Sequence, residues 1–166
     1  ILTQNGHDCK IAYGRETVPE KYKNYAVRIG SDLSVKIDAI KSRIIDNAGF
    51  NSVCATKKFV KWIEEYNPDI IHLHNIHGYY LNNSVLFNYL NNEFKGKIIW
   101  TLHDCWSFTG HCAHFEYQKC NKWKKECKNC PLKFDYPYSW FFDTSNKEFE
   151  NKKRLFSNLN NLIIVT

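Results

Sequence analysis

Residues 69–74 read "DIIHLH", and this stretch decides the fold class. Apart from its two histidines it is apolar without polar alternation, which is typical of a parallel strand covered on both faces. Asn67-Pro68 stops the helical pattern before it, and a second helical pattern over residues 82–94 follows it. The next apolar run, residues 97–102, predicts another strand. A strand, a helix and a strand in this order predict a parallel βαβ unit.

The same alternation extends in both directions from this unit. Helical spacing of apolar residues predicts helices from Ser34 to about Gly49 and over residues 55–66. Ser145 and Glu148 have capping-box spacing for a helix that ends near Leu159. Further strands are expected at residues 9–13, 25–29 and 162–166, the last of them buried. The pattern therefore predicts a doubly wound, mostly parallel Rossmann-like sheet in a single domain over residues 1–166.

Length and composition set broad limits on the class of protein. A chain of 166 residues with 43% hydrophobic content is large enough for one folded domain and unlike a disordered chain. A formal net charge of +6 is compatible with an anionic ligand or an acidic membrane surface and requires neither. The chain begins without Met and ends inside the apolar run "NLIIVT", so we expect both ends to be cut from a longer protein.

Two histidine-bearing segments follow the central predicted strands. They are "HLHNIHG" at residues 72–78 and "LHD" at residues 102–104. Ligands of open α/β sheets bind beyond the carboxyl ends of the strands, where both segments should lie. Histidine and asparagine side chains can each donate or accept a hydrogen bond, which suits the recognition of hydroxyl groups. Asp104 either orients a neighbouring histidine, binds a ligand or caps the following turn. The pattern thus predicts an active site at this edge.

Taken together, these motifs resemble a known family. "NPDIIHLHNIHGYY" and "KIIWTLHDCWSFTGHCAHF", with the cysteines that follow, are similar to the amino-terminal domain of glycosyltransferase family 4 enzymes. The nearest likeness is to bacterial transferases of capsule, colanic-acid-like and other exopolysaccharide synthesis. It is strongest over residues 67–131 and extends from "NGHDCKIAYGR" to "NLIIVT".

This resemblance implies the GT-B architecture, in which two Rossmann-like domains enclose the active site. It implies transfer of a sugar from a nucleotide-sugar donor, with retention of configuration, to a glycan or lipid-linked acceptor. The chain would be the acceptor-side half. A glycine-rich loop would precede Ile1 and the donor-binding domain would follow Thr166, so the fragment alone should be inactive. The odd number of cysteines, the size of the possible core and the alternation of helices and strands predict a cytoplasmic protein. A lipid-linked acceptor would place it on the inner face of the membrane, and neither an organic cofactor nor a nucleic acid partner is expected.

The resemblance carries over to particular residues. His103 matches the family's histidine beside the donor sugar, and with Asp104 it is the candidate catalytic pair. His74, Asn75 and His77 would line the acceptor side. Gly78 and Arg15, which follows the strand at 9–13, complete the candidate substrate-binding set. The alternative for Gly78 is that it only opens the turn, and the alternative for Arg15 is that it is solvated rather than bound to an anionic group.

Five cysteines between residues 105 and 130 form a separate cluster. The C-x-x-C pair Cys127 and Cys130 can grip one tetrahedral ion, and Cys112 with Cys120 is the economical second pair. We therefore expect a structural zinc ion that stabilises a long Cys-rich insertion at about residues 103–137. Reduced buried thiols and disulfides are the alternatives, and the roles of Cys105, His111 and His114 stay open.

Two other functions compete with sugar transfer. A zinc-ribbon module that binds nucleic acid would use the basic, aromatic stretch 117–133, but it leaves the histidine edge unexplained. A non-catalytic sugar- or nucleotide-binding module on a Rossmann-like scaffold is the third candidate.

Overall fold

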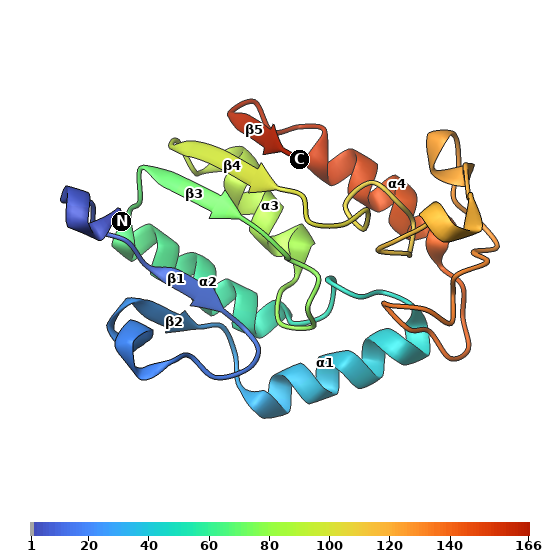
Figure 1. The fold of residues 1–166 in the computed structure, drawn as a ribbon, viewed down its shortest axis with the longest axis horizontal. Helices are drawn as coiled ribbons and strands as arrows, with labels where there is room; N and C mark the ends of the chain where they lie inside the picture. Colours follow the sequence, from blue (N-terminus) through green and yellow to red (C-terminus); the bar gives the residue numbers. More distant parts are fainter. Residues whose placement is uncertain (1) are drawn as a thin grey trace.

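The computed structural model describes residues 2–166 as an α/β structure with parallel strands (Figure 1). The strands are β1 (Ile11–Tyr13), β2 (Ala26–Arg28), β3 (Ile70–Leu73), β4 (Lys97–Thr101) and β5 (Leu162–Val165). The α-helices are α1 (Asp32–Ile45), α2 (Val53–Tyr66), α3 (Asn83–Asn92) and α4 (Ser145–Phe156). The order of elements and the parallel pairing agree with the sequence-based prediction, and they are compatible with a Rossmann-like fold.

The strands do not form one continuous sheet. β1 pairs with β2 in one sheet, and β3, β4 and β5 form a second in that order. Between the edges of β1 and β3 lies a largely apolar cavity of about 310 Å³, lined by Ile11, Ala12 and residues 70–76 among others. The split leaves one edge of β1 and one edge of β3 without a neighbouring strand in residues 2–166.

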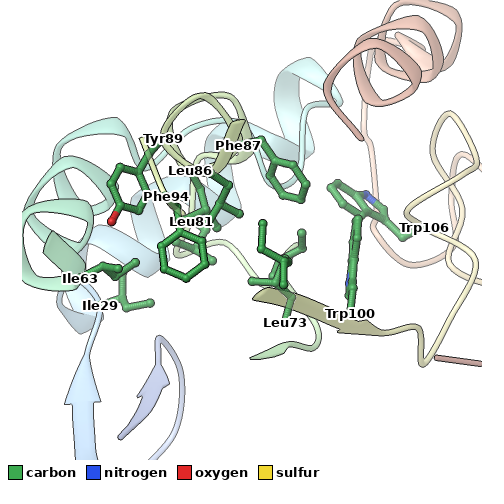
Figure 2. Close-up of a cluster of buried hydrophobic side chains, with 13 residues drawn as sticks. Ile29, Ile63, Leu73, Leu81, Leu86, Phe87, Tyr89, Phe94, Trp100 and Trp106 are labelled. Carbon is green, nitrogen blue, oxygen red and sulfur yellow. The ribbon is translucent and has the colours of Figure 1, made fainter. Parts of the chain in front are cut away.

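The core lies between one face of the larger sheet and the helices. Figure 2 shows Leu73 and Trp100 pointing from the strand layer toward Leu86 and Phe87 of α3. Phe156 of α4 closes this core, with its ring centroid 4.5 Å from that of Phe87 and edge-on to Trp100 at 4.9 Å. Alternation along the strands therefore puts every second side chain into one shared apolar cluster.

The opposite face of the larger sheet is open, which corrects part of the prediction. Figure 1 looks onto this face, with α2 and α3 behind the strands. The strand at 69–74 was expected to be covered on both sides and 162–166 to be buried. Instead Ile70, Ile163 and Ile164 are each more than half exposed. β5 is an edge strand, and no helix among residues 2–166 packs on the second face, so the double winding is not seen.

Helix starts differ in one detail from the prediction. Ser31 caps α1 as expected of a serine, with its side chain accepting from the Ser34 amide at 3.2 Å. The capping box predicted at Ser145 is wrong, because Thr144 precedes α4 and the buried Ser145 hydroxyl has no partner. The amide of Thr144 donates instead to the carboxylate of Asp46, the residue that follows α1, at 2.7 Å.

Between β4 and α4 the chain forms a long irregular segment. Residues 102–144 contain only the short 3-10 helices η3 (Glu116–Gln118) and η4 (Lys122–Lys124). This agrees with the expected loop character of residues 103–137 and extends it to the start of α4. None of the helices over residues 2–166 combines the length and the apolar character that crossing a bilayer takes.

Candidate functional site

The carboxyl ends of β3 and β4 bring the two histidine segments together. Leu73 of β3 pairs with Trp100 of β4, so the residues after each strand leave the sheet side by side. Trp100 strengthens this arrangement, because its indole N–H donates to the backbone carbonyl of His74 at 3.2 Å. A small cleft is lined by both segments, residues 74–77 and residues 100–104 with Trp106 and Ser107.

His74 and His103 contact each other across this cleft. Nδ1 of His74 lies 2.9 Å from Nε2 of His103, and the rings are stacked at 5.2 Å. One of the two nitrogens donates and the other accepts, so the pair shares a single proton in this contact. Burial, followed by the nearby imidazoles of His72 and His103, lowers the pKa of His74. The two imidazoles, which share one proton in this contact, stand at the exposed mouth of the cleft.

His72 belongs to the strand that was expected to be covered on both faces, but it is exposed. Its Nε2 lies 2.8 Å from the hydroxyl of Thr101, and its ring centroid is 4.2 Å from that of His74. The open face of the sheet explains the difference, because His72 is on the side of β3 that no helix covers. The sequence pattern alone did not show which face would be free.

His77 and Asp104 form the buried wall of the cleft. His77 Nε2 lies 3.3 Å from Asp104 Oδ2, and the ring of His77 stacks on Trp106 at 4.9 Å. Burial lowers the pKa of His77 to about 4, although Asp104 works in the opposite direction. The other oxygen of Asp104 accepts from the Trp106 amide at 2.8 Å. Asp104 thus caps the following turn and contacts His77 rather than His103.

Arg15 approaches the same site from the end of β1. Its guanidinium lies over the ring of Tyr79 at 5.9 Å, and its side chain comes close to Gly78. Gly14 allows this approach, because a Cβ there would lie 1.9 Å from the ring of Tyr80. All five of the predicted substrate-binding residues therefore lie around the strand ends: Arg15, His74, Asn75, His77 and Gly78.

Tyrosine side chains at this site were not among the site residues predicted from the sequence. The ring of Tyr136, from the long irregular segment, lies 5.6 Å from His77 and 6.4 Å from Tyr79. Burial raises the pKa of Tyr79 and of Tyr80 to about 12, so both keep their hydroxyl protons at neutral pH. Tyr80 donates its proton to the carbonyl of Asn75. The aromatic richness of residues 134–142 was the only sequence signal for Tyr136.

The cysteine cluster lies apart from this cleft. Cys112, Cys120, Cys127 and Cys130 line one small cavity, together with Trp123 and Phe115. All seven cysteines are free thiols, so no disulfide forms over residues 2–166. Four thiols are the donor set that zinc prefers. In the described part of the chain, however, no group of three or more His, Cys, Asp or Glu side chains has the arrangement to hold a metal ion.

Comparison with known proteins gives one partial match. The chain is 33% identical over 93 residues to WcaC of Escherichia coli K12, a glycosyl transferase assigned to colanic acid biosynthesis. The matched region is 54% of this chain and 22% of that protein, so the match spans about a fifth of the relative's length. No family model matches the chain. No solved structure matches it either.

Proposed function

We propose that this chain is the acceptor-side domain of a retaining glycosyltransferase of surface-polysaccharide biosynthesis. The donor would be a nucleotide sugar and the acceptor a glycan, carried on a lipid at the inner face of the membrane. The observation that carries the proposal is the His74–His103 contact at the carboxyl edge of β3 and β4. The partial identity to WcaC supports the same class of reaction. The assignment to family 4 and to the GT-B architecture is part of the proposal.

The chemistry follows from an imidazole pair that shares one proton in its mutual contact. When the bond between the sugar and the diphosphate breaks, positive charge develops on the sugar ring and negative charge on the leaving group. A neutral imidazole can hydrogen-bond a sugar hydroxyl without placing a cation beside the developing positive charge. His103 would make this contact, with His74 fixing its ring. His77 and Asp104, which are paired and largely buried, would position the acceptor side of the cleft.

The cavity between β1 and β3 supports the proposal that a further strand belongs to this sheet. Neighbouring strands lie about 4.8 Å apart, so a sheet that lacks one strand leaves an apolar slot between two unpaired edges. The slot here has apolar side chains from β1, α2 and β3 around it. A parallel strand supplied from outside residues 1–166 would join the two sheets, and the loop after it would reach the same edge as His74 and Arg15.

The test is sugar transfer by the full-length protein. Radiolabelled UDP-sugars and GDP-sugars are offered with bacterial membrane lipid as acceptor, and labelled lipid is counted. We expect His103→Ala to lower transfer by at least about 100-fold, since it removes a contact to the reacting sugar. The matched control is His7→Ala, an exposed histidine outside the cleft, which should keep transfer unchanged.

Two outcomes would contradict the proposal. Transfer retained by His103→Ala would refute the site. Sugar binding without any transfer by the wild-type protein would favour the non-catalytic binding module instead.

A structural zinc ion at the four cysteines is a separate proposal. The four cysteines line one cavity, but they would have to rearrange into tetrahedral geometry to hold zinc. Metal analysis of reduced protein should find about one equivalent of zinc, and Cys127→Ser with Cys130→Ser should lose it. Less than about half an equivalent in the wild-type protein would refute the site.

A further inference from the structure

Arg15 approaches the acceptor side of the cleft without an anionic partner. Its guanidinium lies over the ring of Tyr79 at 5.9 Å, and its side chain passes beside Gly78. Over residues 2–166 no carboxylate forms an ion pair with it, including that of the neighbouring Glu16. Arg28, at the end of β2, is by contrast paired with Asp32. Because Arg15 is exposed, its positive charge is available to a ligand.

Two backbone positions beside Arg15 adopt an unfavourable conformation. Glu16, with φ at 65°, and Tyr79, with φ at 67°, both lie in the left-handed region that residues with a Cβ rarely occupy. Glu16 directly follows Arg15, and Tyr79 carries the ring below its guanidinium. Backbone strain of this kind is concentrated at ligand-binding positions, where the surrounding structure enforces it. The conformation around Arg15 therefore favours a role in binding.

The electrostatic surroundings on this side of the cleft are positive. The charges of Arg43 and Arg15 both oppose the rise in the pKa of Tyr79 that burial causes. Arg15 also acts on His77, where its charge helps to lower the pKa of the ring. The carboxylate of Asp104 lies here too, but it is already engaged by His77 and by a backbone amide. The positive charge of Arg15 is therefore not compensated by this carboxylate.

Tyrosine hydroxyls add neutral hydrogen-bond donors beside the guanidinium. Burial raises the pKa of Tyr79 to about 12 and also raises the pKa of Tyr136, so both keep their protons at neutral pH. The two rings meet edge-on at 6.4 Å, and Tyr136 is 45% exposed. Positive charge together with protonated hydroxyls is the complement of a carboxylate or a phosphate group.

We propose that Arg15 binds an anionic group of the acceptor, so that this chain acts on a negatively charged glycan rather than a neutral one. The inference rests on the proposed function, which makes this the acceptor side of the cleft. A planar guanidinium can donate two parallel hydrogen bonds to one carboxylate or phosphate. A carboxylate would belong to an acidic sugar, and a phosphate to the carrier of the glycan. The diphosphate of the donor fits less well, because His103, the candidate beside the donor sugar, contacts His74 and not the residues around Arg15.

Binding of small anions tests the site without requiring turnover. The full-length protein is titrated with methyl β-glucuronide, with methyl phosphate and with the neutral methyl β-glucoside, and the affinities are measured by ligand-observed NMR. We expect one of the two anions to bind at least about tenfold more tightly than the glucoside, because hydrogen bonds between charged groups are stronger than those between neutral groups. Preference for the glucuronide assigns an acidic sugar, and preference for methyl phosphate assigns a phosphorylated carrier.

Substitution of Arg15 connects this preference to the residue. Arg15→Met should abolish it, and Arg15→Lys, which keeps the charge but not the planar fork, should keep part of it. The matched control Arg154→Met removes the same charge from an exposed position of α4 and should keep the wild-type preference. Since Arg15 and Arg154 are both exposed, the midpoint of thermal unfolding should be the same in all variants.

Steady-state kinetics separates recognition of the acceptor from catalysis. With membrane lipid as acceptor, Arg15→Met should raise the KM for the acceptor about tenfold or more, while kcat and the KM for the nucleotide sugar stay near their wild-type values. A raised KM for the nucleotide sugar alone would assign Arg15 to the donor and overturn the proposal.

Two results of the titrations would also overturn it: equal binding of all three probes by the wild-type protein, or an anion preference that survives in Arg15→Met. A wild-type protein that binds the anion through Arg15 but transfers no sugar would support anion recognition and refute the transferase, so the two failures are distinguishable.

Discussion

His77 is the most strongly perturbed residue of the candidate site. It is buried against Trp106 and has Asp104 beside it, yet burial outweighs the carboxylate and keeps the pKa of His77 at about 4. At neutral pH the ring is therefore uncharged and can only share a proton with Asp104 or a ligand. A neutral, fixed imidazole is suited to holding a hydroxyl group in one orientation.

This environment predicts a pH dependence of stability. The pKa of His77 is about 4 when folded and 6.5 ordinarily, so the unfolded chain takes up the proton first as the pH falls. The contribution of the uncharged His77 ring to the free energy of unfolding is fully present above pH 6.5 and is lost between pH 6.5 and pH 4. The difference between these two pKa values corresponds to about 3 kcal/mol in the free energy of unfolding. Urea unfolding across this range should show a shallower pH dependence for His77→Gln than for wild type.

The control for this measurement is His7→Gln, at an exposed position. It should keep the wild-type pH dependence. If His77→Gln has the wild-type slope instead, His77 is not the group that takes up the proton on unfolding.

The positions of the candidate site residues could be predicted from the sequence, but the contacts between their side chains could not. Strand ends and residue types were enough to place His74, Asn75, His77, His103 and Asp104 at one edge. They did not show that Asp104 would face His77 and leave His103 to His74, because this depends on how the loops after β3 and β4 turn. Tyr136 could not be placed at this site from the sequence, since 31 residues of largely irregular chain lie between it and Asp104.

At the scale of elements, α4 fixes the segment that follows β4. Lys152 of α4 is fully buried, and its ammonium donates to the carbonyls of Trp106 at 2.9 Å and Thr109 at 3.0 Å. It also lies 3.8 Å from the centroid of the Trp106 ring. Burial lowers the pKa of Lys152 to about 7. The residue therefore links a helix to the turn that carries Asp104 and Trp106.

Replacing Lys152 should loosen this turn. Lys152→Met keeps the apolar stem but leaves two carbonyls without a donor, so we expect a loss of about 3 kcal/mol in the free energy of urea unfolding. Lys153→Met, at the exposed neighbouring position, should change it by less than about 0.5 kcal/mol. Equal effects of the two substitutions would show that the buried contacts do not stabilise this turn.

The helices also show where periodicity misleads. The spacing of Ile37 and Ile40 predicted α1 correctly as an element, and an amphipathic helix ordinarily turns such a face to the core. In the structure the buried positions are Asp38 and Ser42, because Asn51 and Ser52 offer them hydrogen-bond partners. Periodicity identifies a helix and its two faces, but the partner elements decide which face is inside.

At the scale of the whole molecule, the two sheets face each other across an unfilled slot. Ile11 of β1 and Ile70 of β3 are 55% and 54% exposed, and the edges of both strands carry unpaired backbone groups. Exposed parallel edges with apolar side chains are a liability for a folded protein. A further parallel strand between them would satisfy the backbone groups and cover the slot.

Hydrogen exchange can test whether a longer natural form of the polypeptide supplies this strand. Amides of Ile11–Tyr13 and Ile70–Leu73 that face the slot should exchange at least about 100-fold more slowly in the longer form, because they would gain carbonyl partners and lose contact with water. Amides of β4 provide the internal control, since this strand already has β3 and β5 as neighbours. Unchanged exchange at both edges, with β4 equally protected in the two forms, would show that the slot is not a strand position. In that case the slot stays open beside His74 and Asn75, which line it, and it would have to be explained as part of the binding cleft.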